Sequence, residues 1–164
     1  MNFVIDSNIV FSIIISGRKS KAYNIISKHD LELYFPEDGI EEFRKHKEKL
    51  SEYSDEFELR AFLTFALLRV IPRDLYEDKI PEAYELAKQF DEKDTPFIAL
   101  ALKLNALIWT GDKNMIIHSL RTRKYIALDT QAIEELIKGK SLEEVVKNLK
   151  KRYLSNWDPG HNIL

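Results

Sequence analysis

The sequence contains no cysteine and only five glycines and five prolines among its 164 residues. The lack of cysteine excludes thiol nucleophiles, cysteine zinc sites and a disulfide-linked secreted scaffold. With so few glycines there is no glycine-rich phosphate-binding loop. No low-complexity tract or linker divides the chain. A chain of this length buries about two-thirds of its unfolded surface, so its core needs no covalent support.

The chain also lacks an excess of either charge and a long apolar segment. Its 25 basic and 27 acidic residues give a net charge of -2, which permits a polyanionic partner without indicating one. The apolar stretch near the N-terminus has no basic residue before it and is interrupted by Asp6 and Asn8. It is shorter than the roughly 20 residues that a bilayer requires. We therefore expect a cytoplasmic protein without a membrane segment.

Short apolar runs alternate with helical patterns, which indicates an α/β protein. Because such strands pair in parallel through right-handed crossovers, we expect a three-layer α/β/α sandwich with a mainly parallel central sheet. The expected strands are Asn2–Ile5, Leu31–Phe35, Arg69–Ile71, Ala106–Trp109 and Tyr125–Leu128. The expected helices are one ending near Gly17, then Ser20–Lys28, Gly39–Leu50, Asp55–Leu68, Pro81–Phe90, Thr95–Leu104, Thr130–Lys138 and Leu142–Lys151.

We expect one domain over residues 1–164, with a core over about 1–128 and a helical C-terminal extension over about 129–164. The last dozen residues are expected to form an irregular tail, with Trp157 docked on the core. The stretch Phe57–Leu68 repeats apolar residues at the helical period, which favours the core, although an exposed remainder would suit a protein partner.

Acidic residues lie where several predicted strands and helices meet. In a parallel sheet, ligands bind beyond the carboxyl ends of the strands, so acids placed there are informative. Each acid alone has an ordinary structural explanation as a helix cap, a turn residue or a first-turn acid. The acids are Asp6 and Asp112 after two strands, Glu41 and Glu42 at the start of one helix, and Asp91 and Asp94 at the start of another.

Several uncompensated carboxylates in one crevice would repel one another and raise one another's pKa. A hard divalent cation such as Mg²⁺ or Mn²⁺ relieves this repulsion, because it takes carboxylate and water oxygens as ligands. Zinc is disfavoured, since the chain lacks cysteine and any HxxxH spacing. The four histidines share no spacing and are expected at the surface; they are His29, His46, His118 and His161.

The ordered set of these stretches resembles the PIN-domain ribonucleases. The resemblance covers about Phe3 to Met115 and lies in VIDSNIVFS, PEDGIEEFRKH, DEKDTPFIALAL and IWTGDKNM. It implies a catalytic, metal-binding set of Asp6, Glu42, Asp94 and Asp112, with Asp91 as an additional ligand. The register places Glu42 rather than Glu41 at the family's glutamate position, and a shift of the register by one residue would exchange the two. It also implies supporting roles for Ser7, Asn8 and Thr110.

The resemblance implies a Mg²⁺- or Mn²⁺-dependent endoribonuclease that hydrolyses phosphodiester bonds of single-stranded RNA with one or two ions. Some members are toxins, so an antitoxin protein or a second copy of the chain is an expected partner. Basic side chains beside an acidic crevice would contact the RNA backbone. The candidates are Arg18, Lys19, Lys21, Arg44, Lys45, Lys93 and Lys113, with Arg121, Arg123 and Lys124 as another local cluster.

Two other functions remain open from the sequence. The first is a catalytically inactive RNA-binding module of the same fold, against which the intact acids argue. The second is a Mg²⁺-dependent phosphatase on a doubly wound sheet, similar to the haloacid dehalogenases. That class has a second aspartate two residues after the first, and here Asn8 stands at that position.

Overall fold

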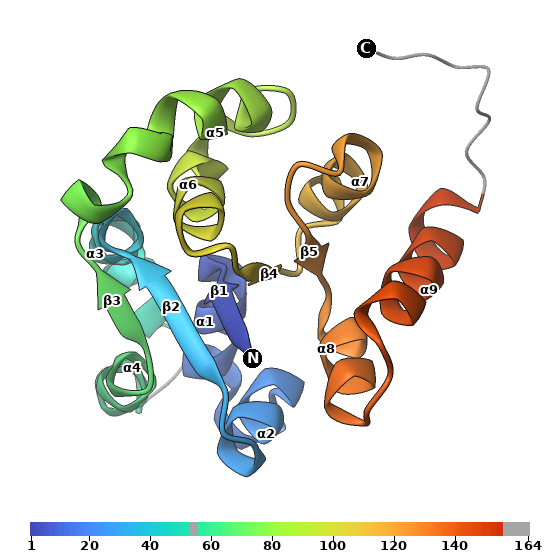
Figure 1. Ribbon diagram of the computed structural model, residues 1–164. Coiled ribbons are helices and arrows are strands. Elements are labelled where there is room, and N and C mark those ends of the chain that lie inside the picture. The colour runs from blue at the N-terminus through green and yellow to red at the C-terminus, as the bar shows by residue number, and fades with distance from the viewer. Residues whose placement is uncertain (53–55, 156–164) are drawn as a thin grey trace.

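A computed structural model describes residues 1–52 and 56–155 of the chain. Its centre is a parallel sheet of five strands in the order β3-β2-β1-β4-β5 (Figure 1). The predicted fold class, an α/β/α sandwich on a parallel sheet, is confirmed. The strands are β1 (Asn2–Ile5), β2 (Glu32–Pro36), β3 (Arg69–Ile71), β4 (Leu107–Trp109) and β5 (Ala127–Leu128).

The helices cover both faces of this sheet. The chain moves from β1 to β2 to β3 in one direction and from β3 to β4 to β5 in the other, so right-handed crossovers put the two sets of connecting helices on opposite faces. The first set is α1 (Ser7–Ser16), α2 (Lys21–Lys28), α3 (Glu37–Ser51) and α4 (Phe57–Ala66). The second set is α5 (Ile80–Ala87), α6 (Thr95–Leu104) and α7 (Lys113–Thr122).

The C-terminal helices α8 (Thr130–Ile137) and α9 (Leu142–Leu154) pack against each other beside β5 (Figure 1). Short 3-10 turns occupy Gly17–Lys19, Arg73–Leu75, Glu77–Lys79 and Glu92–Asp94. Over residues 1–52 and 56–155, no helix is both long enough and apolar enough to cross a bilayer.

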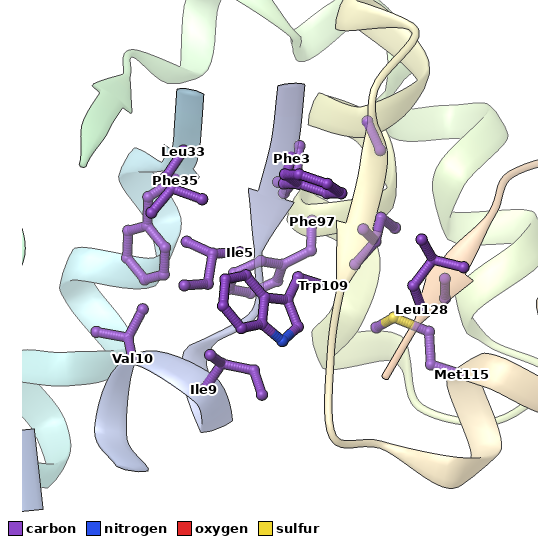
Figure 2. Close-up of a cluster of buried hydrophobic side chains, with 14 of the residues drawn as sticks. Phe3, Ile5, Ile9, Val10, Leu33, Phe35, Phe97, Trp109, Met115 and Leu128 are labelled. Carbon is purple, nitrogen blue, oxygen red and sulfur yellow. The ribbon is translucent and has the colours of Figure 1, made fainter. Parts of the chain in front are cut away.

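The central strands are buried on both faces, as the continuous apolar run of β1 predicts. Phe3, Val4 and Ile5 are fully buried, and so is Trp109 of β4. Figure 2 shows the Trp109 indole in the middle of this core, below Phe3 and near Ile5 and Ile9. The indole N–H donates to the Thr130 hydroxyl over 3.1 Å, so its one polar group is satisfied.

Helix α7 is the main element that the sequence did not predict. The residues Thr110 to Lys113 look like a turn, but the Asp112 side chain accepts hydrogen bonds from the backbone N–H groups of Asn114 and Met115 and thereby starts a helix. A similar difference affects α3, which begins at Glu37 rather than Gly39. Glu41 and Glu42 consequently lie in its second turn and not at its start.

Other boundaries move by a few residues. Strand β2 includes Pro36 as its last residue, which pairs with Ile71 of β3. Helix α9 continues to Leu154, where the sequence predicted an irregular tail from Tyr153. This extension is anchored by Arg152, whose guanidinium contacts the Asp129 carboxylate over 2.8 Å. The predictions for Trp157 and His161 concern positions outside the described residues, as does the expected helix start at Asp55.

Gly39 provides a test of how α3 packs on β2. A Cβ atom added at Gly39 would lie 2.5 Å from two ring atoms of Phe35, which is itself fully buried. We expect Gly39→Ala to lower the free energy of unfolding by about 1–3 kcal/mol through overpacking. This loss should occur although alanine favours helices over glycine by about 1 kcal/mol. Urea denaturation measures the change.

Gly111→Ala is the matched control, because its added Cβ would meet nothing closer than 3.7 Å. Its stability should stay within about 0.5 kcal/mol of the wild type. A Gly39→Ala protein as stable as the wild type would contradict the packing of α3 on Phe35.

Candidate functional site

Asp6 lies at the centre of the candidate site because of how β1 pairs with β4. Ile5 is in register with Trp109, so the next residues, Asp6 and Thr110, come side by side. The Thr110 hydroxyl donates to Asp6 Oδ2 over 2.6 Å, and the Ser7 backbone N–H donates to Asp6 Oδ1 over 2.8 Å. Only 5% of Asp6 is exposed. Both oxygens of this carboxylate are therefore held in a fixed orientation.

Glu42 reaches the same place from α3. The Ser7 hydroxyl donates to Glu42 Oε2 over 2.8 Å, so one residue of α1 touches both Asp6 and Glu42. Glu41 instead forms an exposed ion pair with Arg44 at 2.8 Å. The structure thus places Glu42, and not Glu41, beside Asp6.

Asp94 and Asp91 occupy contrasting environments before α6. Asp94 holds the N-cap position of α6, but its side chain makes no capping hydrogen bond. Its Oδ2 atom is buried and has no hydrogen-bond partner within the part of the chain that the structure describes. Asp91 is exposed and accepts from the Lys93 backbone N–H over 3.0 Å. Capping therefore explains Asp91 but not Asp94.

Asp112 stands on the loop between β4 and α7, and three contacts fix that loop. The Asp112 carboxylate caps α7, and its backbone N–H donates to the Thr110 hydroxyl over 2.9 Å. The Gly111 N–H donates to Asn8 Oδ1 over 3.2 Å. All three predicted supporting residues thus contact a candidate acid or the loop that carries one.

Burial and charge repulsion connect these acids electrostatically. Burial raises the pKa of Asp6 to about 6, and the charges of Glu42 and Asp112 add to the increase, while the hydrogen bonds from Thr110 and Ser7 oppose it. The pKa of Asp94 is raised to about 8, first by burial and then by the charges on Asp6, Asp91, Asp112 and Glu42. Ionising all of them together is therefore costly unless a positive charge is added.

The donor chemistry fits a hard divalent cation. Carboxylate oxygens dominate the cluster, and the buried Asp94 Oδ2 has an unused acceptor position. As the side chains stand, however, no three acidic or histidine side chains among residues 1–52 and 56–155 form a group that could hold an ion. Binding of an ion would therefore require the carboxylates to move closer together than they stand here.

The predicted basic residues differ in their distance from the acids and in their ion pairs. Arg18 and Lys19 follow the C-terminal end of α1, and Lys21 begins α2; the ten residues of α1 separate them from Asp6 by about 15 Å. Three others are close in the chain to the acids: Lys45 follows Glu42 by one turn of α3, Lys93 precedes Asp94, and Lys113 follows Asp112. Arg44 is occupied by its ion pair with Glu41.

Tyr125, His118 and Gln89 form a chain of side-chain contacts that the sequence did not predict. Tyr125 is buried, and its pKa is raised by that burial and by the charges on Asp94 and Asp112. His118 Nδ1 lies 2.9 Å from the Tyr125 hydroxyl, and its Nε2 lies 3.0 Å from Gln89 Oε1. His118 lies at the surface as expected, but it is partly buried. No local pattern connects these three residues.

The raised pKa of Asp94 predicts a pH-dependent stability. In the unfolded chain this carboxyl has a pKa near 3.8 and in the folded chain about 8, so its stabilising contribution is complete below pH 3.8 and is lost as the pH rises through 8. Asp94→Asn removes this dependence. We expect the variant to exceed the wild type in Tm by a larger margin at pH 8.5 than at pH 5, measured by thermal melts in EDTA.

Asp74→Asn changes an exposed acid on the turn Arg73–Leu75 and is the control. Its Tm difference from the wild type should be the same at both pH values. A constant difference for Asp94→Asn as well would contradict the electrostatic coupling at the site.

Comparisons with known proteins agree with this geometry. A family model described as PIN domain matches residues 4–150. The structure is similar to a chain in the crystal structure of VapBC2 from Rickettsia felis bound to a DNA fragment from their promoter, with a TM-score of 0.59 and 16% sequence identity over 79% of this chain and 98% of that one. A search of curated proteins finds no match. The family match spans most of the sequence, and the chain therefore belongs to the PIN-domain family of nucleases.

Proposed function

We propose that this protein is a metal-dependent endoribonuclease that hydrolyses phosphodiester bonds of single-stranded RNA in the cytoplasm. Membership of the PIN-domain family supports a nuclease in general. The observation that carries the proposal is the buried Oδ2 of Asp94, which has no hydrogen-bond partner among the described residues and lies close to the other acids whose charges raise its pKa. An acidic cluster of this kind is unfavourable for stability, which supports a function for it.

In this proposal the catalytic acids Asp6, Glu42, Asp94 and Asp112 hold one or two Mg²⁺ or Mn²⁺ ions, with Asp91 as an additional ligand. When bound, such ions polarise the phosphate and lower the pKa of a water molecule. Thr110 and Ser7 keep Asp6 aimed into the site, and the Ser7 hydroxyl does the same for Glu42. Asn8 steadies the loop of Asp112 through Gly111.

The sequence at Asn8 argues against the phosphatase alternative. An aspartate two residues after Asp6 would be needed there, and Asn8 instead uses its Oδ1 atom to accept from the Gly111 backbone. An inactive RNA-binding module would have no use for a buried carboxylate without a partner, because keeping such a group destabilises the fold.

Asp6→Asn tests the nuclease proposal directly. The substitution keeps the shape of the side chain, and the amide can still accept from Ser7 N–H and interact with Thr110, so the fold should survive. Removal of the central charge should lower Mn²⁺-dependent cleavage of a labelled single-stranded RNA by about 100-fold or more. Addition of EDTA to the wild-type protein should have the same effect. Gel analysis of the cleavage products measures both.

Asp30→Asn, which changes an exposed acid before β2, is the matched control and should cleave like the wild type. Equal cleavage by the wild type and Asp6→Asn would indicate a contaminating nuclease and contradict the proposal. RNA binding without cleavage in every metal would favour the inactive module, and hydrolysis limited to small phosphate monoesters would favour the phosphatase.

Helix α4 carries an exposed apolar face that suits a protein partner. Phe57 and Ala61 are buried as the sequence predicted, whereas Phe62 is 72% exposed and belongs to the exposed remainder of this stretch. Phe62 also borders a groove of about 460 Å³ between α3 and α4, whose walls include Phe43, Phe57 and Phe65. The other exposed members of this face are Leu59, Leu63 and Leu67. We call these four residues the α4 face.

We propose that the α4 face binds an apolar segment of an antitoxin protein, which makes the chain the toxin of a pair. A continuous apolar face of this kind marks an interaction site on a soluble domain. The structural neighbour was solved as a VapBC2 assembly, which supports a two-protein arrangement. The groove beside Phe62 has the apolar lining that receives hydrophobic side chains of a partner helix.

Phe62→Lys tests this partner. The substitution changes an exposed side chain, so it should leave the fold and RNA cleavage unchanged, yet it puts a charge into the α4 face. We expect it to weaken binding of the protein encoded by the adjacent gene by about 100-fold, measured by titration calorimetry. Lys49→Glu, a charge change on the exposed part of α3, is the control. Self-association of the wild type that Phe62→Lys abolishes would instead show that a second copy covers this face.

A further inference from the structure

A polar groove of about 710 Å³ opens beside the acidic site on the α3 side. Glu42, one of the candidate catalytic acids, lines one part of it, and Arg73 lines another. The walls also include Lys45 from α3 and Lys93 from the turn before α6. The groove volume is within the range of about 300–1,000 Å³ that is usual for ligand sites. A nucleotide chain that passes through it would therefore lie next to Glu42.

The two lysines of the groove are free to bind an external anion. Neither Lys45 nor Lys93 has an ion-pair partner among residues 1–52 and 56–155, and both are exposed. Four acids also line the groove, and each has a partner. Asp38 receives the Arg73 guanidinium at 2.6 Å and the Tyr76 hydroxyl at 2.6 Å. Glu37 accepts from the Arg73 backbone N–H, Glu41 pairs with Arg44, and Glu42 accepts from the Ser7 hydroxyl. Among the described residues, the cations of the groove without an ion-pair partner are therefore Lys45 and Lys93.

The groove also offers flat surfaces for bases. The imidazole of His46 and the ring of Pro96 are part of its lining, and the buried Phe97 lies beneath. Single-stranded nucleic acids combine such stacking surfaces with cations that follow the backbone. A double helix keeps its bases stacked on one another and could not use them.

The other basic clusters lie elsewhere. Arg123 and Lys124 line a separate groove with Asn2 and Leu107, the first residues of β1 and β4, and therefore lie at the amino edge of the sheet. The acids lie at the carboxyl edge. Lys19 and Lys21 are beyond the far end of α1 from Asp6. None of these basic residues lies in a groove that adjoins the acidic site.

We propose that the single-stranded substrate enters along this α3-side groove, where Lys45 and Lys93 hold phosphate groups next to the scissile bond. The proposal rests on the nuclease function above, and it assigns one route to the strand out of several basic surfaces. Lys45 and Lys93 bind phosphate groups in this proposal, whereas Arg18, Lys19 and Lys21 do not.

Binding measurements on the Asp6→Asn protein test the route without cleavage. Fluorescence anisotropy with a labelled single-stranded RNA, in EDTA and at several salt concentrations, gives both the Kd and its salt dependence. Adding Lys45→Ala and Lys93→Ala should raise the Kd by about 10-fold and reduce the slope of log K against log salt by about 1.4, because each lost phosphate contact on a single strand accounts for about 0.7. Circular dichroism checks that each variant is folded.

Two further pairs of substitutions make the test specific. Lys28→Ala with Lys138→Ala removes two exposed lysines at the C-terminal ends of α2 and α8 that have no ion-pair partner in the described part of the chain, and it should leave the Kd unchanged. Lys19→Ala with Lys21→Ala tests whether the strand instead passes over the far end of α1. If this pair weakens binding as much as Lys45→Ala with Lys93→Ala, or if the groove pair has no effect, the proposed route is wrong. Cleavage by the wild type is measured separately, so a failed route and a failed nuclease proposal give different results.

Discussion

The register between β1 and β4 is the constraint on which the site depends. Because Ile5 pairs with Trp109, Asp6 and Thr110 leave neighbouring strands at the same level and their side chains meet. The Thr110 hydroxyl also accepts from the Asp112 backbone, so a single hydroxyl connects two candidate acids. A shift of one residue would turn Asp6 toward the opposite face of the sheet, and the cluster would not form. The apolar core around Trp109 prevents such a shift.

The same core makes the acidic cluster energetically unfavourable. Asp6 lies against fully buried strands, and the Asp94 carboxyl is partly buried without a hydrogen bond to Oδ2, so both have raised pKa values. A fold under selection for stability alone would replace such a group by an amide or an apolar residue. The large apolar core supplies the stability that lets the chain tolerate this arrangement, as is typical of functional sites.

The surface features separate into regions that suit different partners. The α4 face is apolar and belongs to the helix beside β3, while the groove with Lys45 and Lys93 opens next to Glu42. Helix α3 contributes to both, since Phe43 lines the apolar groove and Lys45 the polar one. A protein bound to α4 would therefore contact the same helix that carries a candidate catalytic acid. This arrangement connects the proposed partner and the proposed substrate route through one rigid element.

The sequence by itself determined the class of the fold and the candidate acids. Apolar periodicity is a local property, so it located the strands and most helices, and acids after strand ends must meet in a parallel sheet. Only the tertiary structure shows that Glu42, and not Glu41, contacts Ser7 beside Asp6, because one residue on a helix turns a side chain by about 100° and Ser7 belongs to another element. The partnerless Asp94 Oδ2, the helix after Asp112, the exposure of Phe62 and the choice among the lysines likewise depend on neighbours far away in the chain, which local patterns do not record.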